Sequence, residues 1–324
     1  MVDIATEVLS QSITYRFEKL SGDNIGDLVP IYKSAFQKDI SINELIKKFD
    51  TSFTGFKNVG FIAYAPEGEP AAFYGVFPCF ATYNGAKYLV AQSGNTMTHA
   101  NHTGRGLFTA LAKMTYDYCR ENRIHLVFGF PNQNSYPGFV KKLDWKHFDD
   151  MRAYLIRVKC VSWIRIKRIF RLCEKLHQSW GNFMLSLCKK GVAFQSSCNS
   201  NDTIVVDHNK EFLAYKTYAK NYLLEIEGVN VWLKFNESFL LIGDIEKCSG
   251  KVFIKVIAKL KLLSFFMGLP HIRIHCSTGV WLEKSLVSYG AHKRDISYPI
   301  GGINLTQVLP MGKMKFTTAD NDTF

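Results

Sequence analysis

The residues with the clearest chemical potential form the run Thr103-Gly104-Arg105-Gly106-Leu107-Phe108, between a strand-like stretch and an amphipathic helix. A strand that turns through glycines directly into a helix leaves several backbone N–H groups without intrahelical acceptors. These donors and the positive end of the helix dipole favour a phosphate group, and Arg105 adds a cation. Gly104 and Gly106 let an anion approach the backbone closely. The run predicts an anion-binding turn, and the alternative interpretation is an ordinary loop without a ligand.

Strand and helix patterns on both sides position this turn. Residues 87–99 read as a strand, and residues 107–121 place Leu107, Leu111 and Tyr118 on one helical face. Asn84-Gly85 is a strong type I′ turn signal that pairs residues 72–81 with the strand 87–99. The other elements that we expect in this half are strands 13–20, 60–65, 125–130 and 152–159 and helices 23–36, 42–49 and 135–142.

The second half of the chain repeats the same order in a shorter form. Three predicted strands are followed by a helix, a strand, a helix and a last strand. Their ranges are 222–226, 229–235, 239–245, 252–267, 272–276, 281–289 and 293–298. The repetition favours an internal structural repeat. The predicted fold class is α/β of the α+β type, a mixed and mostly antiparallel sheet flanked by helices, built in tandem.

Composition sets the broad class of protein. A chain of 324 residues with 47% hydrophobic and 21% charged residues suits two folded domains. It contains no uncharged apolar run of membrane-spanning length, and residues 1–12 do not resemble a signal peptide. The eight cysteines form no C-x-x-C pair and do not cluster with His. We therefore expect reduced thiols, no metal site and a cytoplasmic location.

The net charge of +12 is compatible with nucleic acid, a polyanionic cofactor or an anionic membrane as partner. Residues 161–190 concentrate the charge, with seven Lys or Arg against one acid, Glu174, and they also hold apolar residues such as Trp163 and Phe170. This pattern suits a membrane or nucleic-acid surface, or a helix whose apolar side packs between two domains. The polar run 195–202 reads as a linker.

With its strand order, its glycine turn and the sequence Gly129-Phe130-Pro131-Asn132 after a buried strand, the region 13–159 resembles the GNAT superfamily of acetyl-CoA-dependent N-acetyltransferases. The family signature R/Q-x-x-G-x-G/A maps onto residues 103–108. Thr103 stands where Arg or Gln is usual, and Phe108 where a small residue is usual, so Phe108 either crowds the cofactor or points into the core. The resemblance implies an acetyl-CoA site at Met97, Thr98, His99, Gly104, Arg105, Gly106, Leu107, Phe108, Asn132 and Asn134.

The implied reaction needs few protein groups, because the acceptor amine is itself the nucleophile. It requires a polarised thioester carbonyl, a deprotonated amine and a proton for the leaving thiolate. The position of the family's usual acid, a tyrosine, falls on Val140, so Tyr136 is the nearest candidate; it also reads as a packed aromatic. His99 and His102 flank the turn, and an imidazole is the side chain most often used as a base, which makes His99 a candidate base. A water chain is the alternative.

The sequence therefore predicts an N-acyltransferase that moves an acetyl group from acetyl-CoA to a primary amine of a small molecule, with an amino sugar as one candidate. Residues 1–159 would bind acyl-CoA, 160–202 would form a basic helical connector, and 203–324 would be a degenerate GNAT-like domain that completes the acceptor cleft. The alternatives are an inactive GNAT-like binding module and a surface protein acting through residues 161–190. Nucleic acid is not an expected partner, peripheral membrane contact stays open, and so does the oligomeric state.

Overall fold

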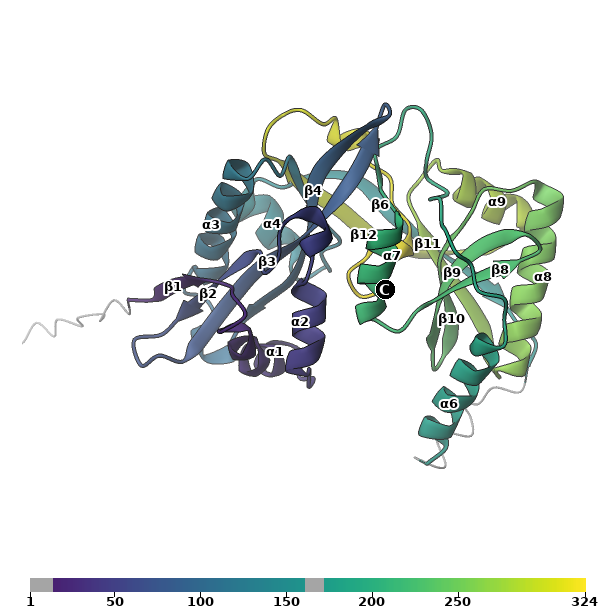
Figure 1. The fold of residues 1–324 in the computed structure, drawn as a ribbon, viewed down its shortest axis with the longest axis horizontal. Helices are drawn as coiled ribbons and strands as arrows, with labels where there is room; N and C mark the ends of the chain where they lie inside the picture. The colour runs from purple at the N-terminus through teal and green to yellow at the C-terminus, as the bar shows by residue number, and fades with distance from the viewer. Residues whose placement is uncertain (1–13, 161–171) are drawn as a thin grey trace, which may run out of the picture.

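The computed structural model describes residues 14–160 and 172–324, and it is built on one long twisted sheet (Figure 1). The strands are β1 (Arg16–Lys19), β2 (Gly60–Tyr64), β3 (Pro70–Tyr83), β4 (Ala86–Thr98), β5 (Leu126–Gly129), β6 (Lys146–Arg157), β7 (Val205–Val206), β8 (Tyr222–Ile226), β9 (Val229–Asn236), β10 (Phe239–Ile245), β11 (His271–Cys276) and β12 (His292–Asn304). The helices are α1 (Leu28–Phe36), α2 (Ile42–Phe49), α3 (Leu107–Glu121), α4 (Tyr136–Leu143), α6 (Leu172–Ser186), α7 (Lys210–Tyr215), α8 (Gly250–Phe266) and α9 (Trp281–Tyr289). The predicted mixed, mostly antiparallel sheet flanked by helices is confirmed.

The order of strands shows how the two halves are joined. It runs β1-β2-β3-β4-β5-β12-β6-β11-β10-β9-β8, with β7 paired to β3. Two neighbouring pairs are parallel, β4 with β5 and β10 with β11, and each pair includes the strands on either side of a long helix, α3 or α8. The last strand of each half crosses to the other half, because β12 pairs with β5 and β6 pairs with β11.

Both exchanged strands are longer than their sequence patterns predicted. β6 begins at Lys146 instead of residue 152, and β12 continues to Asn304 instead of residue 298. The added segments contain Asp149-Asp150 and Gly301-Gly302, which interrupt the alternation of polar and apolar residues. They are strands because each lies beside the other in the middle of the sheet, where the pairing overrides local propensity.

Helices cover both faces of the first half. Phe73 and Phe77 of β3 pack in one core cluster with α1 and α2, whereas Tyr74 and Val76 point to the opposite face and pack in another with α3. Farther along the same strand, Cys79 belongs to a third cluster, which contains α7 and the C-terminal residues. The C-terminal tail therefore lies against the sheet of the first half.

Helix α6 packs on the second half, in a cluster that also includes residues of the exchanged strand β6. Its His177 lies 2.8 Å from the Met267 carbonyl oxygen, and Trp180 Nε1 donates to the Phe266 carbonyl at 2.9 Å. Gly181 lies against the ring of Phe235, where a Cβ would come within 2.5 Å of the ring. For residues 172–186, the predicted packing of an apolar side between two domains is wrong. The rest of the basic stretch, residues 161–171, lies outside the described residues.

The polar run 195–202 is not a free linker. Ser196, Ser197 and Cys198 are buried, and the Ser197 N–H donates to the Asp244 carboxylate at 3.0 Å. Burial raises the pKa of Asp244 to about 6, although the Ser197 hydrogen bonds act in the opposite direction. Within residues 14–160 and 172–324, no helix is long and apolar enough to span a bilayer.

Candidate active site

The candidate site is a cleft that opens where β4 and β5 diverge. The two strands pair at Ala91 with Val127 and at Gln92 with Phe128, and the ladder between them ends there. The other edge of β5 pairs with β12 along its whole length. From Ser93 onward the edge of β4 therefore faces a cavity of about 400 Å³, whose other wall comes from residues 129–132. A polar strand edge beside a hollow can receive an extended ligand.

A bulge in β4 shapes this edge. The pairing with β3 skips a residue between Gly94 and Met97, and Asn95 there has φ 52°. The His99 N–H donates to the Ala71 carbonyl on β3 at 2.8 Å. Because hydrogen-bonding directions alternate along a strand, the N–H of Thr98 points away from β3, toward the side that β5 has left. It can donate to a carbonyl group of a ligand lying along β4.

The predicted anion-binding turn has the geometry expected of it. Gly104 (φ 77°) and Gly106 (φ 75°) are left-handed, and Gly106 is the N-cap of α3. A Cβ at either glycine would meet no atom within 4 Å, so the backbone lies open to solvent. The first N–H groups of α3 have no intrahelical acceptor, and the cap residue has no side chain to supply one. The turn can cradle a phosphate group.

Phe108 does not crowd this turn. Its ring lies 5.1 Å from that of Phe139 and 6.0 Å from that of Tyr74, measured between centroids, and it joins the core cluster beneath α3. Leu107 is buried in the same cluster. Of the two orientations considered for Phe108, the structure shows the one directed into the core.

A chain of hydrogen bonds fixes Arg105. Its guanidinium donates to the Tyr15 hydroxyl at 2.9 Å, and that hydroxyl lies 2.9 Å from His102 Nδ1. His102 Nε2 in turn lies 2.7 Å from Glu69 Oε1. His102 is buried, so it supports the turn from beneath rather than facing a ligand.

The other predicted site residues lie around the cleft in different ways. Asn132 lines it, and its Oδ1 accepts from the N–H groups of Asn134 at 2.9 Å and Ser135 at 3.0 Å, which shapes the start of α4. Asn134 is exposed. Met97 is buried in the core beside α1, so only its backbone can meet a ligand. Thr98 is half-buried at the end of β4.

The two proposed catalytic side chains do not line the cleft. His99 Nδ1 accepts from the Asn101 N–H at 3.3 Å and forms a cap. Tyr136 begins α4, with its ring 6.1 Å from that of His147. Burial and the nearby charge of Asp150 raise the pKa of Tyr136, which keeps the hydroxyl protonated, as a proton donor requires.

Lys48 and Asp322 are two polar residues of the cleft that sequence reasoning missed. Lys48 Nζ donates to Asp322 Oδ2 and to Asn95 Oδ1, each at 2.8 Å. The side chains of the ion pair are only 13% and 14% exposed. A Cβ on Gly94 would come within 3.0 Å of Asp322 Oδ2, so the carboxylate lies over the face of β4 at Gly94. No local pattern marks either residue, because they meet only in the folded chain.

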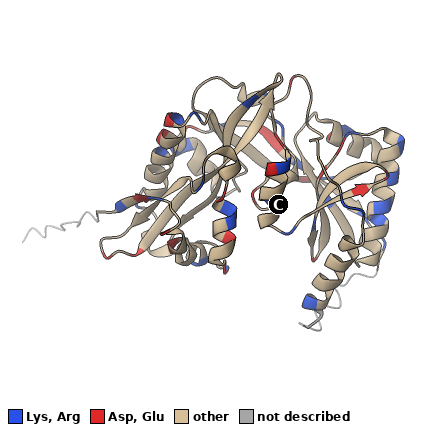
Figure 2. Ribbon diagram, viewed as in Figure 1, with Lys and Arg blue, Asp and Glu red and all other residues tan. Residues whose placement is uncertain are grey.

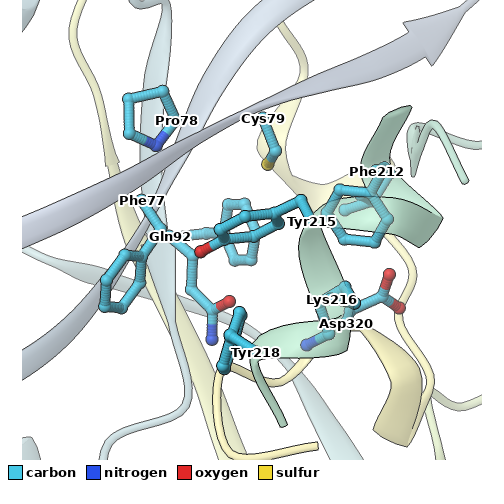
Figure 3. Close-up of a pocket in the computed structure, with 11 residues that line it drawn as sticks. Phe77, Pro78, Cys79, Gln92, Phe212, Tyr215, Lys216, Tyr218 and Asp320 are labelled. Atoms are coloured by element: carbon cyan, nitrogen blue, oxygen red, sulfur yellow. The ribbon is translucent and has the colours of Figure 1, made fainter. Parts of the chain in front are cut away.

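Residues 215–218 of the second half bind the backbone on both sides of the Lys48–Asp322 ion pair. The Tyr215 hydroxyl donates to the Lys48 carbonyl at 2.9 Å, and the Tyr218 hydroxyl donates to the Asp322 carbonyl at 2.6 Å. Lys216 Nζ donates to the Asn321 carbonyl at 2.5 Å. These three side chains surround a small internal cavity, with Gln92 of β4 on its other side (Figure 3).

The internal cavity has a structural role. Its volume of about 10 Å³ has room for roughly one water molecule, so it is no substrate pocket. Lys216 is fully buried there, and this burial lowers its pKa to about 7. His208 Nε2 lies 2.8 Å from Asp320 Oδ1 in the same layer. The cavity therefore belongs to the seam between the sheet, α7 and the C-terminal tail.

The glycine turn at the start of α3 and the diverging strands β4 and β5 lie in a part of the chain that matches a known family. Residues 17–148 match the family model described as an acetyltransferase (GNAT) domain. The protein carries a domain of the GNAT superfamily and is an enzyme of the N-acetyltransferase type.

Solved structures share this architecture over nearly the whole chain. A probable N-acyltransferase from Enterococcus faecalis V583 superimposes with a TM-score of 0.60 at 13% identity, covering 90% of this chain and 73% of that one. A GCN5-related N-acetyltransferase from Kribbella flavida gives 0.57 at 9% identity, covering 91% and 72%. The N-myristoyltransferase of Saccharomyces cerevisiae with bound myristoyl-CoA gives 0.54 at 8% identity, covering 90% and 79%. At these identities the likeness concerns the fold. No curated protein matches the sequence.

Proposed function

We propose that this protein transfers an acetyl group from acetyl-CoA to a primary amine of a small molecule, with an amino sugar as the acceptor class. The observation that carries the proposal is the cleft between β4 and β5, whose edge leads directly into the glycine turn at the start of α3. A thioester donor with a pyrophosphate needs both features, a cradle for the anion and a strand edge for the extended arm.

The residues present fit such a donor. The open N–H groups around Gly104 and Gly106, with Arg105 beside them, would hold the pyrophosphate. The β4 edge from Met97 to His99 would pair with the pantetheine arm, and the Thr98 N–H is aimed to polarise a carbonyl. Acetyl-CoA supplies the activated thioester carbonyl when bound. Asn132 and Asn134 would contact the same ligand from the opposite wall.

The acceptor would bind in the same cleft, next to Asp322. A carboxylate attracts an ammonium group and can take the proton whose loss frees the nitrogen lone pair, and the neutral amine then forms the new C–N bond. The C–S bond breaks in the same transfer. The nitrogen loses its second proton, for which His99 is the proposed base, and the thiolate takes up a proton, for which Tyr136 is the proposed donor. Because neither side chain lines the cleft, each would act through water. Aromatic rings of Tyr32, Phe36 and Phe130 line the cleft beside these polar groups. Rings mixed with a few placed polar groups suit a sugar.

We further propose that residues 203–324 form a second GNAT-like unit that binds no acyl-CoA. The start of α8 differs from that of α3, because Ser249 caps it with its own side chain, accepting from the Val252 N–H at 3.4 Å. The Ser249 hydroxyl thus satisfies a backbone N–H group at the start of α8, whereas the N-cap Gly106 of α3 has no side chain that could do so. On this proposal, residues 1–159 bind the donor, 160–202 connect, and 203–324 complete the acceptor cleft through Asp322.

Free-thiol release tests the proposal. Purified protein is mixed with acetyl-CoA and a panel of amines and amino sugars, and propionyl-CoA and myristoyl-CoA test the acyl length. We expect amine-dependent thiol release with acetyl-CoA and its loss in Gly106→Trp. Calorimetry with acetyl-CoA separates the alternatives: binding without turnover would indicate an inactive module, and no binding would overturn the donor site.

A further inference from the structure

Helix α6 carries an apolar stripe on its solvent side. Leu176, Trp180, Phe183 and Leu187 follow one another at helical spacing and are 65%, 43%, 52% and 65% exposed. The opposite side of the helix is buried against the second half through His177 and other residues. A surface helix of a soluble protein ordinarily carries polar residues on its outer face. This stripe needs a partner that folding of the described chain does not supply.

The C-terminal end of α8 extends the stripe. Leu262, Phe265 and Phe266 are each about half exposed there. The hydrogen bond from Trp180 Nε1 to the Phe266 carbonyl ties the two helices together. The helices lie side by side at one end of the molecule (Figure 1). Leu187 directly follows the last residue of α6. We define the α6–α8 surface as these seven apolar residues: Leu176, Trp180, Phe183, Leu187, Leu262, Phe265 and Phe266.

The charges around this surface are mainly positive. Lysines occur on both helices (Figure 2). Lys189 and Lys259 line one hollow with Leu262 and Phe266, and Lys175, Lys190 and Lys255 are exposed on or next to the same helices. Two acids lie nearby: Glu225 of β8, which is paired with Lys189 at 2.6 Å, and Glu227 of the β8–β9 turn.

We propose that the α6–α8 surface binds the anionic face of a phospholipid bilayer. Exposed rings and leucines would enter the boundary between headgroups and acyl chains, and the lysines would meet lipid phosphates. The indole of Trp180 suits this boundary, since its polar N–H is already satisfied and its ring stays exposed. The lysine rim favours this partner over a second copy of the chain, because two such rims would face each other.

Vesicle co-sedimentation at low salt tests the proposal. The probes are vesicles of phosphatidylcholine alone and vesicles with about a third phosphatidylglycerol. The test variant is Phe183→Ser/Leu187→Ser, and the matched control is Val287→Ser/Val308→Ser, whose side chains are comparably exposed at 60% and 51% but lie elsewhere. Thermal unfolding followed by circular dichroism verifies that each variant folds.

We expect the wild type and the control to bind the anionic vesicles and to release with added salt. In the test variant the partition coefficient should fall by about tenfold or more. Absence of wild-type binding at low salt, or equal binding by the test variant, would overturn the proposal. Sedimentation velocity tests whether a second copy of the chain binds this surface instead. If the wild type is a dimer that does not bind vesicles, and the test variant is a monomer, the surface serves self-association and the proposal is overturned.

Discussion

Lys48 Nζ and Asp322 Oδ2 lie 2.8 Å apart although 274 residues separate them in the chain. Lys48 belongs to α2 of the first half, and Asp322 comes from the C-terminal tail that follows the second half. Their ion pair lies in the wall of the cleft at the diverging edge of β4. The cleft of the GNAT domain is therefore completed by residues far outside the matched region 17–148.

Replacing Asp322 with Asn tests its part in the reaction. The amide keeps the shape but cannot hold an ammonium group or take its proton, so kcat should fall about a hundredfold while KM for acetyl-CoA stays the same. Steady-state kinetics with both substrates varied measures this. Asp202→Asn is the control, because Asp202 also pairs with a lysine, Lys313, but is exposed. An unchanged kcat in Asp322→Asn would remove Asp322 from the mechanism.

Gly106→Trp should raise KM for acetyl-CoA by about tenfold or more, because a large side chain would fill the open space above the turn. Gly85→Trp provides the matched control, since Gly85 has nearly the same φ of 76° in the β3–β4 turn. Backbone strain is thus shared, and only the position differs. Equal KM values for the two variants would argue against the turn as a phosphate site.

Tyr15→Phe should weaken acetyl-CoA binding indirectly, through the position of Arg105. The Tyr15 hydroxyl accepts a hydrogen bond from the Arg105 guanidinium at 2.9 Å and lies 2.9 Å from His102 Nδ1. Without the hydroxyl, the guanidinium loses the hydrogen bond that fixes its position. A hydrogen bond of this kind contributes about 1 kcal/mol, which corresponds to a roughly fivefold higher Kd for acetyl-CoA by calorimetry. Tyr88→Phe, on the distal part of β4, should leave Kd unchanged. A Tyr15→Phe variant with wild-type affinity would show that Arg105 does not contact the ligand.

Lys216 makes stability depend on pH. Burial lowers its pKa from 10.5 to about 7, so between these values the unfolded chain binds a proton that the folded chain does not. Stability therefore rises with pH across this window, by about 1.4 kcal/mol per unit. The difference in unfolding free energy between the wild type and Lys216→Met should rise with that slope from pH 7 to 10, measured by urea unfolding. Lys210→Met, on the exposed side of α7, should give a flat difference.

A fragment of residues 14–159 should not fold by itself. It lacks β12, which lies between β5 and β6 in the sheet, so both strands would expose unpaired edges. The full chain should unfold in a single calorimetric transition, and the fragment should show none. A cooperative transition in the fragment would mean that the first half is an independent domain despite the exchange.

Local patterns predicted most of the elements well. Asn84-Gly85 set the hairpin, and the 3.6-residue spacing of Leu107, Leu111 and Tyr118 set α3, because turn geometry and helical periodicity depend on neighbours in sequence. The full lengths of β6 and β12 could not be predicted in this way. Their polar and glycine-containing ends are strands only because each pairs with the other half.

The sequence by itself determined the glycine turn, the strand that leads into it and the helix that follows, since these rest on backbone freedom and periodicity within one short stretch. The tertiary structure alone decided the direction of Phe108, the ion pair of Lys48 with Asp322 and the exposed side of α6. Each of these depends on contacts between separate elements: Phe108 packs with Phe139 and Tyr74, Lys48 pairs with Asp322, and Trp180 of α6 hydrogen-bonds to Phe266. Contacts between residues that are far apart in the chain leave no local periodicity in the sequence, so they can be recognised only in the folded structure.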